Sequence, residues 1–150
     1  MLSNEIILFV LLSYLTGGFP SAVWVGKTFY NLDVREFGSG NSGATNTFRV
    51  LGKKAGIPVL FMDIFKGWLA INYVNFLSNS LVLEQGSPEI YFETQLAFGI
   101  SAVIGHLFPI YTGFRGGKGI ATMLGLLIGL HPLAALYSFL VFVIIFLITK

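Results

Sequence analysis

Two glycine-rich segments of the sequence carry polar side chains of the types that bind phosphate groups. Arginine offers phosphate oxygens a planar fork of N–H donors, lysine a mobile point charge, and serine and asparagine neutral hydrogen bonds. Glycine lets backbone N–H groups approach an anion closely, and a helix that begins just after such a loop adds its positive end. The candidate phosphate-binding residues are Ser39, Gly40, Asn41, Gly43, Arg49, Arg115, Gly116, Gly117 and Lys118. Either segment alone is explained equally well as a simple turn, whereas two such segments on one side of a membrane favour an anion site.

Two nucleotide-binding motifs are approximated in these segments, and neither is complete. Residues 38–43 spell G-x-G-x-x-G, but no strand–helix–strand unit is expected around them, and Asp63, at the usual distance for the acidic partner, lies in an apolar stretch. Residues 113–118 approach a P-loop, but the glycine spacing is one residue short and Gly119 replaces the hydroxyl residue that would hold magnesium. The sequence therefore does not predict a nucleotide site.

Three ionisable residues lie within or at the end of apolar stretches, where a charge is costly and often functional. His106, beside the second glycine-rich segment, is a candidate proton acceptor or phosphate ligand, with a structural helix-capping role as the alternative. Asp63 and Lys66 stand one helical turn apart and can neutralise each other. We interpret them as a supporting pair that positions the first segment, with a purely structural ion pair as the alternative.

The composition is that of a membrane protein. Of the 150 residues, 55% are hydrophobic and 11% are charged, whereas a soluble domain carries about 25% charged residues. The absence of cysteine excludes a disulfide framework, a thiolate metal site and a cysteine acyl-enzyme in this chain. The net charge of +2 is too small to indicate nucleic-acid binding.

Long uncharged stretches predict an all-α bundle of about five membrane-spanning helices. The predicted spans are residues 6–26, 57–77, 94–114 and, as two shorter helices divided at His131–Pro132, 119–149. Gly17, Gly18 and Pro20 should break the first helix, which is tolerated where neighbouring helices cover the freed backbone groups. Gly125 and Gly129 form a small-residue pair typical of close helix packing.

Basic residues gather in two loops, which are therefore predicted to face the cytoplasm together with the glycine-rich segments. They are Lys27, Arg35, Arg49, Lys53 and Lys54 after the first span, and Arg115 and Lys118 after the third. The loop after the second span contains Glu84, Glu89 and Glu93 without a basic residue, so it is expected outside. The N-terminus with Glu5 is then outside as well, and Lys150 returns to the cytoplasm.

The polar segments, taken in order, resemble one enzyme family closely. Residues 39–49, the pattern Asp63-x-x-Lys66-Gly67, and residues 105–122 are similar to motifs of the bacterial membrane glycerol-3-phosphate acyltransferases that use acyl phosphate, the PlsY family. The resemblance runs over essentially the whole chain. It implies a multi-pass protein of the bacterial cell (inner) membrane with its active site at the cytoplasmic face.

The resemblance also implies a reaction. A fatty acyl group would pass from acyl phosphate to the 1-hydroxyl of glycerol 3-phosphate, giving lysophosphatidic acid and phosphate, the first step of phospholipid synthesis. Glycerol 3-phosphate and acyl phosphate are then the substrates, membrane lipids surround the chain, and no cofactor, metal or nucleic acid is expected. Because acyl phosphate is an activated anhydride, orientation and charge stabilisation can carry most of the rate.

The same resemblance assigns roles within the two segments. Ser39, Asn41 and Arg49 would help bind the substrate phosphate. Arg115 and Lys118, with the glycine amides around them, would hold the second or the departing phosphate. The candidate catalytic residues are Asn46, His106 and Lys118. The first two of these would orient the substrate or receive the hydroxyl proton, for which a substrate phosphate oxygen is the alternative.

Members of this family normally continue, soon after a segment like residues 146–150, into a third cytoplasmic motif and two more helices. The chain is therefore expected to be a single transmembrane acyltransferase domain, residues 1–150, without the C-terminal part of the family domain. A small-anion transporter and an inactive truncated membrane subunit are the alternatives. A transporter should carry its ligands near the bilayer midplane within an internal repeat, and the sequence indicates neither feature.

Overall fold

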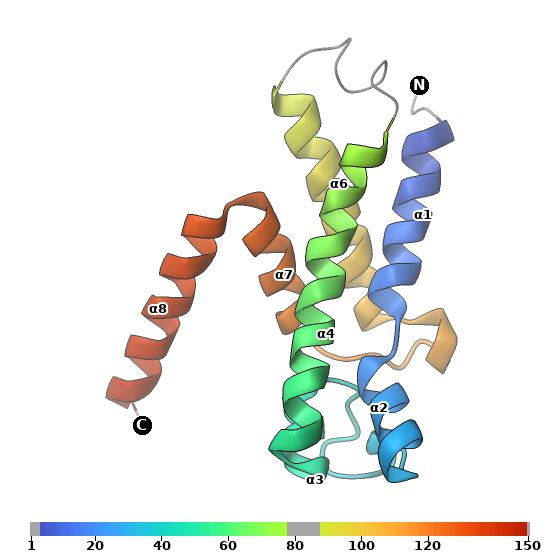
Figure 1. Ribbon diagram of the computed structural model, residues 1–150, viewed down its shortest axis with the longest axis vertical. Coiled ribbons are helices and arrows are strands. Elements are labelled where there is room, and N and C mark those ends of the chain that lie inside the picture. The colour runs from blue at the N-terminus through green and yellow to red at the C-terminus, as the bar shows by residue number, and fades with distance from the viewer. Residues whose placement is uncertain (1–3, 78–87, 150) are drawn as a thin grey trace.

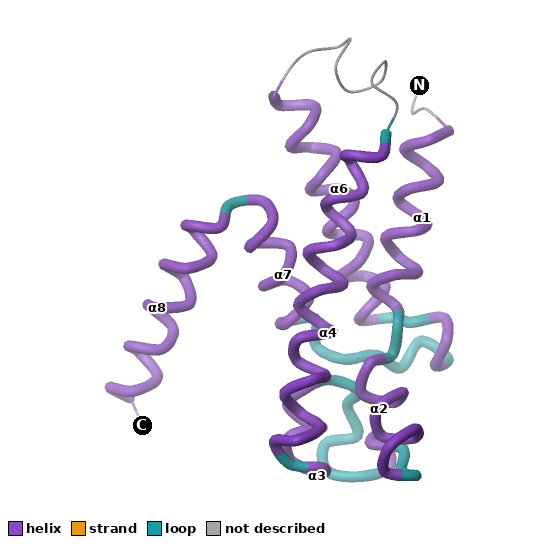
Figure 2. Tube along the Cα trace, in the orientation of Figure 1, coloured by secondary structure: helices purple, strands orange, loops and turns teal. Residues whose placement is uncertain are grey.

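The computed structural model describes residues 4–77 and 88–149, and within them it consists of helices and loops without strands (Figure 2). The longer helices are α1 (Asn4–Gly18), α2 (Ser21–Tyr30), α3 (Ala44–Leu51), α4 (Lys53–Asn72), α6 (Pro88–Leu107), α7 (Ile120–Leu130) and α8 (Pro132–Thr149). The 3-10 helices are η1 (Val34–Glu36), η2 (Tyr73–Phe76) and η3 (Ile110–Thr112). The predicted all-helical membrane fold is confirmed.

The bundle is formed by α1, α4, α6 and α7. Helix α6 packs against α1 and α4, α7 packs along α4, and α8 packs against α7 while leaning away from the other helices (Figure 1). Most of the loop backbone, together with α2 and α3, gathers at the end of the bundle opposite to the start of α1 (Figure 2). The two glycine-rich segments therefore lie toward the same end of the bundle, as the distribution of basic residues predicts. Glu84 and Lys150, for which the sequence also predicts a side of the membrane, lie outside the described residues.

The first predicted span is broken where the sequence indicates. Helices α1 and α2 meet at Phe19–Pro20 with a bend of 42°. Because proline lacks a backbone N–H and disrupts the hydrogen bonding of a helix, a break of this kind frees backbone carbonyl groups. The Lys66 ammonium of α4 donates to the Phe19 carbonyl oxygen at 3.0 Å. A neighbouring helix thus covers one of the freed groups, as a broken helix in a membrane requires.

The number of spans is smaller than the five expected. In the described part of the chain, three helices are long and apolar enough to cross a membrane, and the bent pair of α1 and α2 makes a fourth. The predicted division at His131–Pro132 is present, and the chain reverses direction there (Figure 1). However, α7 has 11 residues and a length of about 16 Å, roughly half of a hydrocarbon core. The expected number of five spans is therefore too high, because the helix formed by the first half of the apolar stretch 119–149 is too short to cross a membrane.

Glycine allows the helices of the bundle to approach backbone to backbone. A Cβ atom added to Gly17 of α1 would lie 1.9 Å from the Ala102 carbonyl oxygen of α6. One added to Gly125 of α7 would lie 1.9 Å from the Ile64 carbonyl oxygen of α4, and Gly129 is similarly restricted by the side chain of Ile71. The predicted packing role of Gly125 and Gly129 is therefore confirmed.

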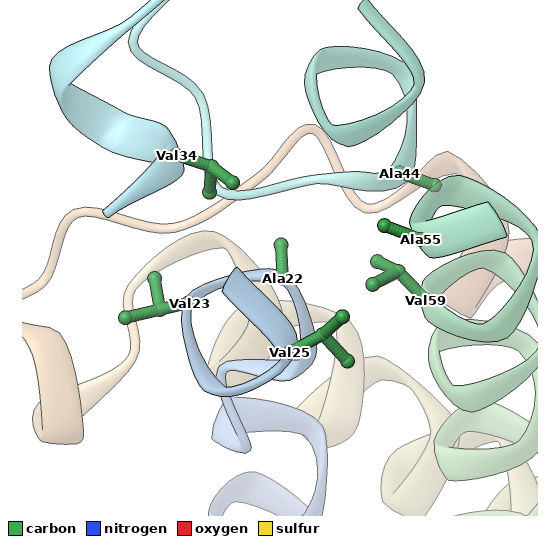
Figure 3. Packing of buried hydrophobic residues seen from close by; sticks show 7 residues of the cluster. All are labelled: Ala22, Val23, Val25, Val34, Ala44, Ala55 and Val59. Atoms are coloured by element: carbon green, nitrogen blue, oxygen red, sulfur yellow. The ribbon is translucent and has the colours of Figure 1, made fainter. Parts of the chain in front are cut away.

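An apolar cluster fixes the beginning of the first glycine-rich segment. It consists of Ala22, Val23, Val25, Val34, Ala44, Ala55 and Val59, all of them buried (Figure 3). These residues come from α2, η1, α3 and α4, which are thereby held together. The segment between η1 and α3 is consequently anchored at both ends on a packed base.

We predict that Gly17→Ala lowers the stability of the folded chain by about 1–3 kcal/mol, because α1 and α6 must separate to admit the methyl group. The measurement is thermal unfolding in detergent. The neighbouring variant Gly18→Ala is the control, since a Cβ atom there would meet its nearest atom, in the Tyr111 ring, at 3.4 Å. Equal melting temperatures for the two variants would contradict the close approach of α1 and α6.

We predict that cysteines placed singly at Glu89 and Lys118 react with an impermeant thiol reagent from opposite sides of the membrane. Glu89 lies at the start of α6, and Lys118 follows the loop after its end. The chain has no native cysteine, so each label reports one position. Labelling of both residues from the same side would contradict the topology.

Candidate active site

The first glycine-rich segment is shaped by Asn46 from within α3. Asn46 is 1% exposed, and its Oδ1 accepts hydrogen bonds from the Ser39 backbone N–H at 2.8 Å and the Ser39 hydroxyl at 3.1 Å. Its Nδ2 donates to the carbonyl oxygens of Val34 at 2.8 Å and Phe37 at 3.1 Å. Gly38 lies against the same side chain with a φ of +62°, a conformation that favours glycine. Both donors and the oxygen of the Asn46 amide are therefore engaged in holding the loop.

The second glycine-rich segment folds against His106 at the end of α6. The Gly117 backbone N–H donates to the His106 carbonyl oxygen at 3.1 Å. A Cβ atom on Gly116 would lie 2.0 Å from that carbonyl oxygen, and one on Gly117 would lie 2.2 Å from His106 Nε2. These glycines therefore provide room for the histidine, and the Gly117 N–H that was predicted to bind phosphate is engaged with the backbone.

The two segments, which the sequence predicts only to share one face of the membrane, contact each other. The Gly117 backbone lies against Gly43, whose Cα is 3.3 Å from a Cβ atom built on Gly117. The Ser42 hydroxyl donates to the Arg115 carbonyl oxygen at 3.3 Å. Segments about 70 residues apart in the chain thus form one continuous polar surface.

A pocket of about 250 Å³ opens between these segments. It is lined by Ser39, Asn41, Gly43, Ala44, Thr45, Asn46, Arg49, Leu60, Asp63, His106, Lys118, Gly119, Ile120, Ala121 and Leu124. Eight of the predicted site residues are among them. The side chains of Arg49 and Lys118 are exposed and form no ion pair within the described residues. The pocket therefore carries two positive charges that nothing in that part of the chain neutralises.

Two helices begin at the same pocket. Gly43 precedes α3 and Gly119 precedes α7, and neither helix has a side-chain cap. The first backbone N–H groups of a helix have no partner within the helix, and the helix dipole adds a positive potential there. Both effects act in the same direction as Arg49 and Lys118, so the electrostatic potential of this pocket, the anion pocket, favours a negatively charged ligand.

Four predicted phosphate-binding residues do not line this pocket: Gly116 and Gly117, which pack against His106, and Gly40 and Arg115. Arg115 and Gly40 line a neighbouring surface pocket together with Asp33 and Arg35. Arg35 donates to Asp33 at 2.7 Å and to the Thr112 carbonyl oxygen at 3.3 Å, which ties the two segments together. The Arg35 hydrogen bond holds the pKa of Asp33 well below its usual range, so this clamp stays charged at physiological pH. Arg115 and Gly40 are thus close to the anion pocket without lining it.

Asp63 and Lys66, which the sequence predicts to be a supporting pair, form a buried network at the floor of the pocket. Asp63 is 1% exposed, and its Oδ1 accepts a hydrogen bond from the Ser21 hydroxyl at 2.7 Å and lies 3.0 Å from Lys66 Nζ. Lys66 also donates to the Phe19 carbonyl oxygen, so the network joins α4 to the break between α1 and α2. His106 Nδ1 lies 3.8 Å from Asp63 Oδ1, beyond a hydrogen bond. The predicted Asp63–Lys66 ion pair is confirmed.

Some residues of the site carry no sequence signal. Ser21 and Ser42 are ordinary serines whose hydroxyl partners are distant in sequence, and Thr45 is exposed at the rim of the pocket. Ser42 and Thr45 lie within the first glycine-rich segment, each between two predicted site residues, whereas Ser21 lies outside both segments. In the described residues, no group of three or more histidine, cysteine, aspartate or glutamate side chains is arranged to hold a metal.

Comparison with known proteins identifies the family. A family model described as glycerol-3-phosphate acyltransferase matches residues 7–150. The chain belongs to this family. A glycerol-3-phosphate acyltransferase of Enterococcus faecalis is 48% identical over 146 residues, which cover 97% of this chain and 62% of that protein.

Solved structures agree with the family. PlsY, an integral membrane glycerol 3-phosphate acyltransferase, matches in its glycerol 3-phosphate form with a TM-score of 0.76 and 36% identity. Its lysophosphatidic acid form matches with a TM-score of 0.77 and 35% identity. Each match covers 96% of this chain and 66% of the PlsY chain, so this chain spans just under two thirds of that protein's length. The family and the position of the pocket toward one end of the bundle argue against the small-anion transporter.

We predict that Asn46→Ala lowers the stability of the fold by about 1–3 kcal/mol, because buried carbonyl and N–H groups of the first loop lose their partners. Thermal unfolding in detergent measures this effect. The control is Asn41→Ala, which removes a pocket side chain that makes no hydrogen bond within the described residues. An unchanged melting temperature for Asn46→Ala, with turnover abolished, would instead indicate a direct part in the chemistry.

Proposed function

We propose that this chain transfers a fatty acyl group from acyl phosphate to the 1-hydroxyl of glycerol 3-phosphate, giving lysophosphatidic acid and phosphate. The observation that carries the proposal is the pair of unneutralised cations, Arg49 and Lys118, on one pocket with two helix N-termini. Both substrates are phosphate monoanions or dianions, which such a pocket attracts. The family membership supports the same reaction.

The phosphate of glycerol 3-phosphate would lie between Arg49 and Lys118 at the rim. The side-chain amide of Asn41 lines the same wall and would donate a neutral hydrogen bond, whereas the Ser39 hydroxyl on that wall already donates to Asn46 Oδ1. The guanidinium fork of Arg49 would fix the phosphate orientation, while Lys118 adjusts as a point charge to the anion that develops during transfer. In this arrangement Lys118 touches the reacting groups, whereas Asn46 positions the loop.

An apolar groove next to the pocket would hold the acyl chain. It has a volume of about 410 Å³ and lies between α6 and α7. Its lining is Leu96, Ile100, Val103, Ile104, Met123, Leu124, Leu126 and Leu127. Leu124 lines both this groove and the anion pocket. A fatty acyl phosphate has one long apolar part and one anionic part, so the two adjoining spaces match its two halves.

In the proposed reaction, the primary hydroxyl oxygen of glycerol 3-phosphate attacks the carbonyl carbon of acyl phosphate. The new ester C–O bond forms, the bond from the carbonyl carbon to the phosphate oxygen breaks, and phosphate leaves with the electron pair. The hydroxyl proton passes to a phosphate oxygen or to His106. Arg49, Lys118 and the helix N-termini stabilise the negative charge throughout, so no enzyme nucleophile is required.

The proposed setting is the bacterial cell (inner) membrane, with the pocket facing the cytoplasm. The basic residues around the glycine-rich segments support this orientation. Membrane lipids would surround α4, α6 and α8, which present large exposed apolar side chains such as Phe61, Ile104 and Phe142.

We predict that Arg49→Ala and Lys118→Ala each lower kcat/KM for acyl transfer by roughly 100-fold or more, because each removes a charged donor to a phosphate. The assay follows labelled lysophosphatidic acid formed by the purified chain in lipid vesicles. Lys54→Ala is the matched control. Lys54, at the start of α4, is also an exposed basic residue, but it does not line the pocket.

Equal loss of activity in all three variants, or no loss in any, would contradict the proposed phosphate site. A folded chain without activity that regains it when a longer relative's C-terminal part is appended would identify this chain as an inactive part of the enzyme.

A further inference from the structure

The loop that leads to Lys118 contains a turn that other contacts must hold in place. Gly113 and Phe114 both have left-handed backbone angles, with φ of +64° and +62°. This region is sterically disfavoured for an aromatic residue, and such a conformation persists only where the surrounding structure fixes it. The Phe114 N–H donates to the Pro109 carbonyl oxygen at 2.9 Å, which fixes the η3 side of the turn.

Two hydrogen bonds reach this loop from the part of the chain around the first glycine-rich segment. Just before the turn, Arg35 Nη1 donates to the Thr112 carbonyl oxygen at 3.3 Å. Just after the turn, the Ser42 hydroxyl donates to the Arg115 carbonyl oxygen at 3.3 Å. Arg115 precedes Lys118 by three residues, so the two bonds set where Lys118 lies relative to the first segment.

Asp33 aims the Arg35 side chain at this loop. Arg35 Nε and Nη2 donate to the two carboxylate oxygens of Asp33 at 3.0 and 2.7 Å. Asp33 also accepts from the Arg35 backbone N–H at 3.0 Å, which fixes the carboxylate at the start of η1. A bidentate pair keeps the planar guanidinium in one orientation, so the remaining nitrogen points to Thr112. With all three nitrogens engaged and its charge neutralised, Arg35 differs from the unpaired Arg49 and Lys118.

We propose that Arg35 is a positioning residue for acyl transfer, which holds Lys118 close enough to Arg49 for both cations to act on one substrate phosphate. This proposal rests on the proposed function. The attraction between a cation and an anion falls with their separation, so a displaced Lys118 would contribute less to binding. Arg35 does not line the anion pocket and would act through Lys118 alone.

The test measures the Kd of labelled glycerol 3-phosphate for the full chain in detergent by equilibrium dialysis. Arg35→Gln removes the guanidinium fork together with its bond to Thr112, and we expect Kd to rise roughly 10-fold. Arg35→Lys keeps the charge, but one ammonium group cannot reproduce the planar fork and the third bond, so Kd should rise about threefold or more.

Lys27→Gln is the matched control for the Arg35 variants. Lys27 Nζ also pairs with Asp33, at 3.2 Å, but in the described residues Lys27 makes no bond to the second glycine-rich segment. Its loss should therefore change Kd by less than about twofold. Thermal unfolding in detergent shows whether each variant is folded.

A double variant separates positioning from direct contact with the phosphate and from a general loosening of the fold. A residue that acts through Lys118 loses its effect when Lys118 is absent, so the two substitutions should be strongly non-additive. In the Lys118→Ala background, Arg35→Gln should change Kd by less than about twofold, against roughly 10-fold in the unmodified chain.

An unchanged Kd in Arg35→Gln would overturn the positioning role and leave the proposed function intact. Equal rises with and without Lys118 would overturn it as well, and so would equal rises in Arg35→Gln and Lys27→Gln. Failure of the unmodified chain to bind glycerol 3-phosphate would overturn the proposed function together with this proposal. Should Arg35→Gln fail to fold, the same comparison with Arg35→Lys decides.

Discussion

The structure depends on how one buried carboxylate is neutralised inside an apolar bundle. Asp63 lies in a membrane helix, where an isolated charge is expensive, and Lys66 one turn later provides the opposite charge. The same lysine satisfies the Phe19 carbonyl oxygen that the helix break exposes, and Ser21, just past the break, donates to the carboxylate. One network therefore allows the chain to bend, fastens α2 to α4 and sets the floor of the anion pocket.

The distinction between structural and functional cations follows from their partners. Lys66 and Arg35 are paired with aspartates, and both also bond to backbone carbonyl groups of other segments. Arg49 and Lys118 are exposed beside the pocket and form no ion pair in the described residues. Since residues of the same type occur in both groups, partners rather than residue identity indicate which charges are available to a substrate.

Much of this arrangement was predictable from local sequence features. Gly17, Gly18 and Pro20 mark the helix break, and the glycine-rich segments mark the two loops that meet at the pocket. The length of α7 was not predictable, because a continuous apolar stretch does not show which part of it forms a helix long enough to span the membrane. The position of Arg115 in the neighbouring pocket and the loop-holding role of Asn46 depend on contacts with distant residues, which spacing in the sequence does not encode.

The most direct test is whether the purified chain, reconstituted in lipid vesicles, converts acyl phosphate and labelled glycerol 3-phosphate. The account predicts labelled lysophosphatidic acid together with an equal amount of inorganic phosphate, because the acyl group moves directly between the two substrates. Binding of glycerol 3-phosphate without either product would mean that the anion pocket does not suffice for catalysis. Release of phosphate without lysophosphatidic acid would show hydrolysis in place of transfer and would contradict the proposed orientation of the two substrates.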